Sequence, residues 1–408
     1  APAQHDRGGV ADDEHGDADA VVANSAEPPA CEPRADHADE QEREQAGTAR
    51  SIVSHRGNIA ATAGKPPVQR VWVSSPFRSF EQAMWTFDSD TDPGYWVEVE
   101  SPTNATLRDL TGTANGPVAV GDKGVAVGRG NDRWGVILEN GPGARSQTLH
   151  AVDSTDDGER LWFAGAGGAL GYYDLQTEQR RDYSKPQGNA GTFYSLTVAG
   201  DRGGEKLLVA DGSGHVIPAH VRDDSATDVT IGWETTPNAG NAVEAIAHDD
   251  EGYGYAVDVN SNVFMTTEKD GWTRVGVDDA QGSFYDCAYG DGVFVTGGGN
   301  GMVFEAAELT DHDGHESRSD SLANQNATRS GDDEATWTPT ELGEFTVYGL
   351  DAGYGGQLAC GEGGNVYIRQ TGGEWEQGKH EPTHTFRAGL VDEQMVVVGA
   401  GGLIVERR

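Results

Sequence analysis

Short apolar runs alternate with glycine-rich or polar breaks from Tyr95 to the end of the chain. The commonest unit is an apolar run, a tight turn of the form small-x-x-small, and a second apolar run, as in VAVGDKGVAV. Glycine permits the positive φ angles of such turns, so each unit predicts a β-hairpin. Seven copies occur, and they begin at Val118, Leu161, Leu207, Tyr255, Val293, Leu358 and Val396.

The copies lie about 40 residues apart, with one longer gap before the sixth copy, and this period is typical of propeller blades. A short apolar segment precedes each hairpin and an aromatic-led segment follows it, so each unit holds four strands. Six of the following segments are headed by Trp134, Tyr183, Trp233, Trp272, Trp337 and Trp375. We expect each of these aromatic residues to pack its outer strand against the hairpin and against the next blade.

The seventh outer strand is missing after the last hairpin, because the chain stops at Arg408. A segment of the same kind, YWVEVE, stands in front of the first full unit and contains Trp96. An N-terminal strand that fills the outer place of the last blade leaves no open edge between first and last blades. The pattern therefore predicts an all-β, seven-bladed propeller over residues 94–408, closed by its own N-terminal strand.

The remaining segments lack this pattern. Residues 1–68 have scarcely an aromatic side chain and no period, so we expect a disordered acidic tail, with Met84 as an alternative start site. Residues 69–93 are read as a linker. Residues 308–336 are polar and charged, and they predict a surface loop inserted between the third and fourth strands of blade 5.

The net charge of the chain argues against one class of binding partner. The formal net charge is -38, with 67 acidic against 29 basic residues, and only 6 of the basic residues are lysine. Such a composition resembles proteins of halophiles that keep molar salt in the cytoplasm, where the Debye length of ~3 Å screens the repulsion. No basic stripe exists to release counterions from a phosphate backbone, which argues against nucleic acid as a partner.

The three cysteines (Cys31, Cys287 and Cys360) are too few and too scattered for a disulfide framework or a thiolate zinc site. We interpret Cys287 and Cys360 as small buried residues on strands. No apolar run approaches the length of a membrane-spanning helix, and no secretory signal is visible. We expect a monomer without a membrane partner, cytoplasmic by default, and a processed leader is left open.

Three segments carry the order of hairpin, turn and tryptophan most fully: AVGDKGVAVGRGNDRW, VFMTTEKDGW and VYIRQTGGEW. This order resembles the Asp-box (bacterial neuraminidase repeat) propellers, which are similar to WD40 and YVTN propellers, and above all the photosystem II stability/assembly factor-like repeats. The resemblance covers residues 95–408 and implies a rigid platform for protein assembly. Every copy in this chain departs from the Asp-box consensus. A halophile of this kind has no photosystem II, so only the generic role of such propellers, a platform for protein assembly, is expected here.

The third position of each inner strand predicts one ring on the face that carries the hairpin turns. Its members are Arg108, His150, Tyr194, Glu244, Tyr285, Tyr348 and Arg387. Aromatic side chains give contact area and arginine gives forked hydrogen bonds, so the ring is a candidate funnel for a protein or peptide. The alternative is that these side chains satisfy one another around a water-filled channel.

Two other functions are weighed against this scaffold. Sialidases of this fold use an arginine cluster and a tyrosine activated by a glutamate, and Arg108, Arg387, Tyr285 and Glu244 match those residue types. A third ring arginine is absent, and no acidic proton donor is evident. An attachment propeller of a virus or cell surface is the other alternative, and it requires export.

Metal and cofactor sites are not expected. The segment DSDTDPG, residues 88–94, has the alternate carboxylates of a calcium loop, but Pro93 replaces the glycine and Val99 stands where a chelating residue is needed. The segment DHDGH, residues 311–315, lies in the expected surface loop. Both are interpreted as solvated. The recurring Gly-x-x-Gly is turn chemistry, and no strong catalytic constellation appears.

Overall fold

The computed structural model describes residues 95–408, which lie in the second of the two units of the chain, Pro76–Arg408. The description leaves out residues 144, 227, 233, 238–239, 251, 268–270, 278–279, 281, 307–308, 310–335, 371–372 and 380–383. The predicted tail (1–68), the linker (69–93) and nearly all of the predicted loop (308–336) therefore lie outside the described residues.

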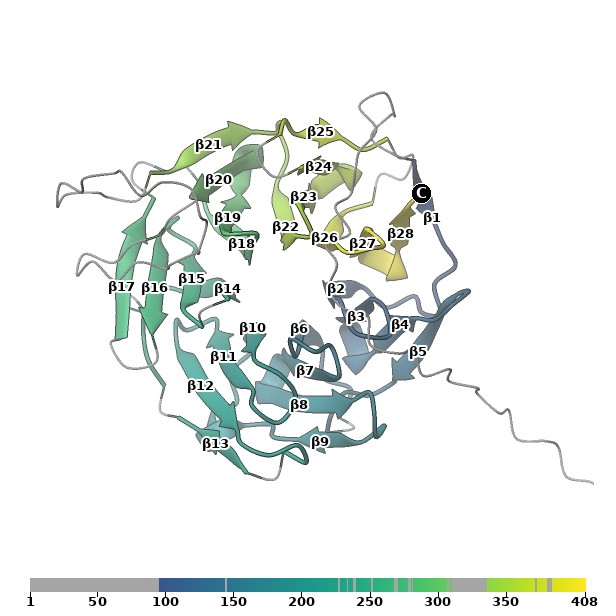
Figure 1. Ribbon diagram of the computed structural model, residues 1–408, viewed down its shortest axis with the longest axis vertical. Coiled ribbons are helices and arrows are strands. Elements are labelled where there is room, and N and C mark those ends of the chain that lie inside the picture. Colours follow the sequence, from purple (N-terminus) through teal and green to yellow (C-terminus); the bar gives the residue numbers. More distant parts are fainter. Residues whose placement is uncertain are drawn as a thin grey trace, which may run out of the picture. The chain divides into compact units, whose positions relative to one another are not determined.

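Seven four-stranded antiparallel sheets follow one another around a ring (Figure 1). We number the blades 1–7 by their inner strands, which are β2 (Leu107–Thr111), β6 (Leu149–Ser154), β10 (Phe193–Ala199), β14 (Val243–His248), β18 (Phe284–Gly290), β22 (Val347–Gly353) and β26 (Phe386–Leu390). The second strands are β3 (Val118–Gly121), β7 (Arg160–Gly165), β11 (Lys206–Asp211), β15 (Gly254–Asp258), β19 (Val293–Gly298), β23 (Gly356–Gly361) and β27 (Val396–Gly399).

The third strands are β4 (Ala126–Arg129), β8 (Ala169–Asp174), β12 (Val216–Val221), β16 (Val263–Thr267), β20 (Met302–Ala306), β24 (Val366–Gln370) and β28 (Ile404–Arg407). The outer strands are β5 (Trp134–Leu138), β9 (Arg180–Asp182), β13 (Val229–Ile231), β17 (Gly271–Gly276), β21 (Thr338–Glu341), β25 (Glu376–Gln377) and β1 (Trp96–Glu98). Short 3₁₀ turns are η1 (Asp122–Gly124), η2 (Ala166–Gly168), η3 (Pro186–Gly188), η4 (Gly299–Gly301), η5 (Glu362–Gly364) and η6 (Ala400–Gly402).

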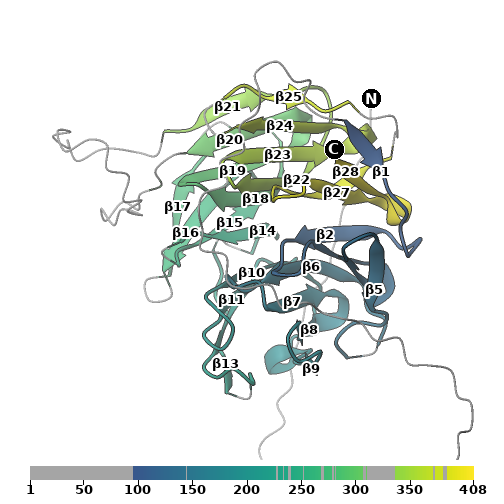
Figure 2. The same ribbon diagram turned by 45° about the vertical axis from the view of Figure 1, so that its right-hand side comes forward.

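The predicted ring closure is confirmed. The last sheet has the strand order β1-β28-β27-β26, so its outer strand comes from the start of the described chain. Trp96 lies opposite Arg407, and Tyr95 and Arg408 exchange backbone hydrogen bonds at 3.3 and 2.8 Å. Both views place the C-terminal end beside β1 (Figures 1 and 2). The edge that the last blade would expose is thereby paired.

The apolar core is divided among the interfaces between neighbouring blades. Seven clusters of buried residues occur in the described part of the chain, and each contains residues of two adjacent blades. The residue directly before each ring position is at most 2% exposed, and these residues are Leu107, Leu149, Phe193, Val243, Phe284, Val347 and Phe386. A blade is therefore stable only when its neighbours are present, which makes closure of the ring important for stability.

The tryptophans of the outer strands contact the preceding blade, which corrects the expectation that they contact the next one. Trp134 of blade 1 donates its indole N–H to Glu406 of blade 7, and Trp337 of blade 5 donates to the Val275 carbonyl of blade 4. Trp96 of blade 7 packs in the cluster shared with blade 6. Residues of a strand alternate between two faces, and the pattern of residue types does not say which blade each face meets.

Blades 2 and 3 also differ from the predicted pattern. The outer strand β9 ends at Asp182, before Tyr183, and Asp174 closes the tight turn in front of this strand by accepting hydrogen bonds from the backbone of Gln176 and Thr177. Tyr183 stacks on Trp162 of its own blade at 5.7 Å between ring centroids, and its hydroxyl donates to the Ala226 carbonyl of blade 3, so this aromatic residue contacts the next blade as expected. In blade 3 the outer strand β13 precedes Trp233, which lies outside the described residues.

Candidate functional site

Every inner strand contains a β-bulge, and the bulged residue is the one that the sequence assigns to the ring. In blade 1, for example, Leu107 pairs with Gly121 and Asp109 with Val120, so Arg108 has no partner in the ladder. The bulged residues of the seven inner strands are Arg108, His150, Tyr194, Glu244, Tyr285, Tyr348 and Arg387. A bulge redirects the side chain of the unpaired residue, so these positions are structurally equivalent.

The hairpin turns lie at the same end of each blade as the bulges. In every blade the residue that begins this turn donates its backbone N–H to the carbonyl of the residue before the inner strand, at 2.8–3.4 Å. The donor and acceptor residues are Asp122–Thr106, Ala166–Thr148, Gly212–Thr192, Val259–Ala242, Gly299–Ser283, Glu362–Thr346 and Ala400–Thr385. In blade 6 the approach is so close that a Cβ atom on Gly361 would lie 1.9 Å from the Thr346 carbonyl oxygen.

Three ring residues of blades 1–3 form a first arc, in the order of the blades. The Arg108 Nε donates to Asp122 Oδ1 at 2.7 Å, in the hairpin turn of the same blade. The rings of His150 and Tyr194 lie 5.2 Å apart, with their planes tilted by 55°. Burial, assisted by the charge of Arg108, lowers the pKa of His150 to about 4, so this histidine is a neutral aromatic surface at neutral pH.

Three ring residues of blades 5–7 form a second arc. The rings of Tyr285 and Tyr348 lie 5.7 Å apart, and the Arg387 guanidinium lies over the Tyr348 ring at 4.6 Å from its centroid. The Arg387 Nε is buried and has no hydrogen-bond partner within the described residues. A guanidinium held on an aromatic face keeps its forked donors in a fixed direction, which suits recognition of a planar or anionic group.

Glu244 of blade 4 lies between the two arcs in the order of the ring. A pocket of about 430 Å³ adjoins it, between blades 3 and 4, lined by Thr192, Tyr194, Gly212, Ser213, Ala242 and Glu244. Desolvation raises the pKa of the Glu244 carboxyl. Blades 7 and 1, which contribute the two arginines, are three blades away from Glu244 in either direction. The ring therefore has a cationic side and an anionic side.

The ring residues are more accessible than the residues beside them. Tyr194 is 43% exposed and Tyr285 is 37% exposed, among the few large apolar side chains in the described part of the chain that face solvent. The Arg108 side chain is 33% exposed, and the other four ring residues are half-buried. Aromatic and arginine side chains that are accessible at equivalent positions are typical of binding surfaces.

Four half-buried carboxylates on the inner strands were not predicted from the sequence. Each accepts a backbone N–H of the following blade at 2.6–2.7 Å, and the acceptor and donor residues are Asp109–Val152, Asp153–Val198, Asp286–Leu350 and Asp351–Val391. Burial raises the pKa of Asp109 and of Asp351 to about 7. The signal in the sequence was an aspartate at the fourth or sixth position of the inner segments, one or three residues after the ring position.

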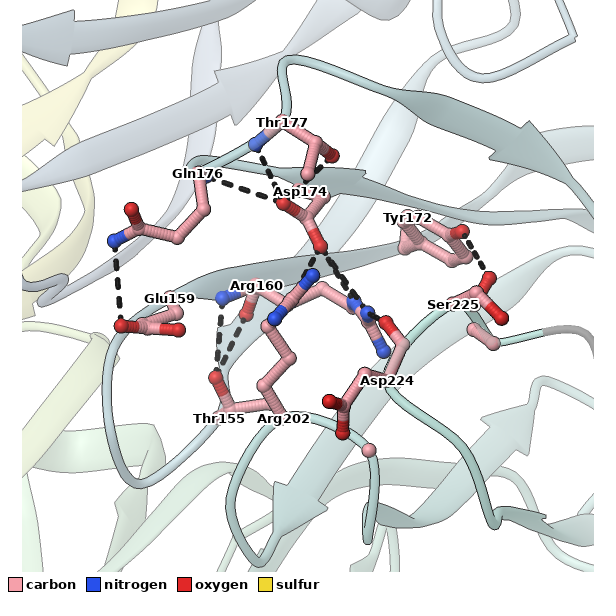
Figure 3. Close-up of polar contacts among 12 residues, drawn as sticks. Thr155, Glu159, Arg160, Tyr172, Asp174, Gln176, Thr177, Arg202, Asp224 and Ser225 are labelled. Atoms are coloured by element: carbon pink, nitrogen blue, oxygen red, sulfur yellow. Dashed lines mark hydrogen bonds and ion pairs between the residues drawn. The ribbon is translucent and has the colours of Figure 1, made fainter. Parts of the chain in front are cut away.

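A second polar network, also missed, joins blades 2 and 3 at the other end of β7 from the ring (Figure 3). Arg160 is 0% exposed, and its guanidinium contacts Asp174 at 3.1 Å and Glu205 of blade 3 at 2.5 Å. Arg202 also contacts Asp174, at 2.7 Å. A buried arginine of this kind needs its partners to offset desolvation, so the network serves assembly of the fold.

Catalytic and metal chemistry receive little support from the described residues. Among them, no group of three His, Cys, Asp or Glu side chains is placed to hold a metal ion. Cys287 and Cys360 are buried free thiols, as expected. Tyr285 pairs with Tyr348, and within the same residues it makes no hydrogen bond to Glu244, so the tyrosine–glutamate pair of a sialidase is not formed. Residues 88–94 and 311–315 lie outside the described ranges.

The fold is that of known propellers. No family model and no curated protein matches the sequence. The structure is similar to YCF48 from Cyanidioschyzon merolae (12% identity, TM-score 0.57, covering 77% of this chain and 98% of that chain). It is also similar to YCF48 bound to D1 peptide (13% identity, TM-score 0.56, 78% and 98% covered). The WD40 propeller domain of Doa1 is a third match (14% identity, TM-score 0.56, 77% and 96% covered).

At these identities the likeness shows the fold alone, a seven-bladed β-propeller of the kind found in WD40 and YCF48 proteins. No helix in the described residues is long and apolar enough to cross a membrane.

Proposed function

We propose that the protein is a non-enzymatic scaffold that binds a protein or peptide segment at the ring of bulged residues. The observation that carries this proposal is the repetition of the bulge in all seven inner strands, each time at a residue that is not fully buried. A purely structural channel lining has no need of two aromatic pairs and an arginine stacked on one of them. The same arrangement suits a partner that crosses the face of the propeller.

The chemistry of the ring favours a polypeptide over a small substrate. Two arcs, each holding an arginine and two aromatic rings, offer area and hydrogen-bond donors spread over several blades. A small ligand is usually enclosed on most of its surface, whereas this ring is open. One of the similar structures is YCF48 bound to D1 peptide, which supports peptide binding as a use of this fold. The aromatic rings and arginines are also the residue types that dominate protein interfaces.

We further propose that the protein works in molar salt. The net charge of -38 and the presence of only 6 lysines support this setting, because self-repulsion of such a chain is screened only at high ionic strength. In that setting, affinity rests on buried contacts and aromatic area more than on exposed charge pairs. The ring, with its stacked and half-buried residues, fits this requirement.

The proposal is tested by selecting random linear peptides, by mRNA display in molar KCl, against the folded propeller. The variant Arg108→Ala/Tyr348→Ala/Arg387→Ala removes part of each arc. The matched control Arg180→Ala/Arg181→Ala/Tyr354→Ala removes the same residue types from exposed positions outside the ring. We expect the peptides selected on the wild type to bind the control and to lose at least about tenfold in affinity for the ring variant. Equal binding to both variants would place the binding surface elsewhere.

A further inference from the structure

We propose that the pocket beside Glu244 accepts a basic side chain, lysine or arginine, of the bound segment. This inference rests on the proposed function and specifies the chemistry of the partner. It concerns one sector of the ring, formed by blades 3 and 4.

The Glu244 carboxylate has no partner within the described residues. Other acidic side chains at the hairpin turns are satisfied: Asp122 by Arg108, Asp211 by Asn189, and Asp258 by the backbone of Asn262. Glu244 is half-buried, and desolvation raises its pKa because no neighbouring charge or donor offsets the loss of water. A partly desolvated carboxylate without a donor is costly, and an incoming cation would supply both charge and hydrogen bonds.

The pocket has the shape and lining for such a side chain. Its volume of about 430 Å³ exceeds what a single lysine or arginine requires, so the side chain can enter with its main chain lying across the mouth. The Tyr194 ring is one wall. A Cβ atom on Gly212 would lie 2.5 Å from the Tyr194 ring, so the glycine of this turn lets the ring lie directly over the backbone. Two polar residues, Thr192 and Ser213, also line the pocket.

In the order of the ring, Glu244 has a tyrosine as its neighbour on each side. Tyr194 of blade 3 and Tyr285 of blade 5 are both substantially exposed. A pocket lined by a carboxylate and the Tyr194 ring is suited to an ammonium or guanidinium group, which gains a charge-assisted hydrogen bond and a cation–π contact. A bare metal ion fits less well, because in the described residues no second and third ligand lies beside Glu244.

The distribution of charge around the ring directs the basic residue to this sector. Arg387 lies in blade 7, three blades from Glu244, and its Nε has no partner among the described residues, so a cation in contact with it is repelled, whereas a cation at Glu244 gains a counter-charge. His150 adds no opposing charge at neutral pH, because its pKa is lowered to about 4. The ring thus selects by repulsion as well as attraction, and it fixes the direction in which the segment lies.

The experiment repeats the peptide selection on Glu244→Gln and Glu244→Lys. We expect a lysine or arginine at one position of the wild-type peptides, loss of that preference with Glu244→Gln, and a preference for aspartate or glutamate with Glu244→Lys. Glu362→Gln is the matched control, because Glu362 lies in the hairpin turn of blade 6 and its carboxylate accepts a hydrogen bond from the Thr346 hydroxyl. Its peptides should keep the basic residue.

The possible failures are distinct. Ring-dependent peptides without a basic residue, or the same preference on Glu244→Gln, overturn this inference and leave the proposed function standing. Absence of ring-dependent peptides overturns both. A double-mutant cycle then isolates the pair: methionine in place of the basic residue of a selected peptide should cost about tenfold in affinity on the wild type and almost nothing on Glu244→Gln. Thermal melting checks that Glu244→Gln is folded.

Discussion

The Glu406 carboxylate, in the last strand of the chain, accepts a hydrogen bond from Arg129 Nε of blade 1 at 2.6 Å. The same oxygen accepts the Trp134 indole N–H at 2.9 Å, and Glu406 is only 2% exposed. Strand β1 joins the first and last strands of the propeller within blade 7, whereas Glu406 joins blade 7 to blade 1. The ring is therefore closed twice, once by a sheet ladder and once by an ion pair between neighbouring sheets.

Replacing Glu406 by glutamine should destabilise the propeller by about 3 kcal/mol, because it leaves the Arg129 guanidinium largely buried without its counter-charge. The measurement is urea unfolding, which allows the salt concentration to stay constant. Glu376→Gln is the control, since Glu376 is exposed in the outer strand β25. Equal stability of the two variants would mean that the ladder alone closes the ring.

Replacing Trp96 by alanine should cost about 3–5 kcal/mol, the usual loss for a large aromatic side chain in a core. Trp96 is 3% exposed and packs among residues of blades 6 and 7. The variant therefore weakens the interface between blades 6 and 7. Tyr95→Ala alters the neighbouring residue, which is 69% exposed, and should change stability by less than about 0.5 kcal/mol. Similar losses in both variants would contradict the burial argument.

The repeat pattern was sufficient to predict the blades and their closure, because hairpins are local and the missing seventh outer strand could be found at the front of the chain. It also identified the ring positions, since each follows a fully buried residue such as Leu107 or Phe386. The bulge at these positions could not be predicted, because it depends on the turn reaching back to the strand, as Asp122 does to Thr106.

The sequence also did not predict which blade each tryptophan contacts, or what the inner aspartates bind. Trp134 packs against blade 7 and Asp109 binds the backbone of blade 2, and both contacts depend on how neighbouring sheets are staggered. In a chain with 67 acidic residues, a buried carboxylate cannot be distinguished from a solvated one by composition. Contacts between blades are long-range, and the pattern within one blade contains no information about them.

Stability in constant molar KCl should fall as the pH rises from about 4 to about 7. The folded-state pKa of Asp109 and of Asp351 is about 7, well above the ordinary value near 4, because burial outweighs the backbone hydrogen bonds to these carboxyls. The folded state therefore binds protons that the unfolded chain releases in this window, and ionisation opposes folding. The stabilisation is fully present below pH 4 and is lost as the pH passes through 7.

The inner aspartates face one another as well as the backbone, since Asp109 is influenced by Asp153, and Asp286 by Asp109 and Asp351. Each carboxyl can contribute at most about 1.4 kcal/mol per pH unit, and partial exposure reduces this figure. Asp109→Asn should give a shallower dependence of the unfolding free energy on pH than the wild type, measured by urea unfolding. The exposed control Asp132→Asn should keep the wild-type slope. An unchanged slope in Asp109→Asn would assign the dependence to surface charge.

Lowering KCl from molar concentration to ~0.1 M should lower the melting temperature by at least about 5 °C, equivalent to a loss of a few kcal/mol for a domain of this size. The Debye length grows from ~3 Å to ~10 Å, so repulsion among carboxylates of neighbouring blades is screened much less. Sucrose strengthens apolar burial without screening charge, and it should restore only part of the loss at low salt. Full recovery in sucrose, or a melting temperature independent of KCl, would show that screening is not what the fold requires.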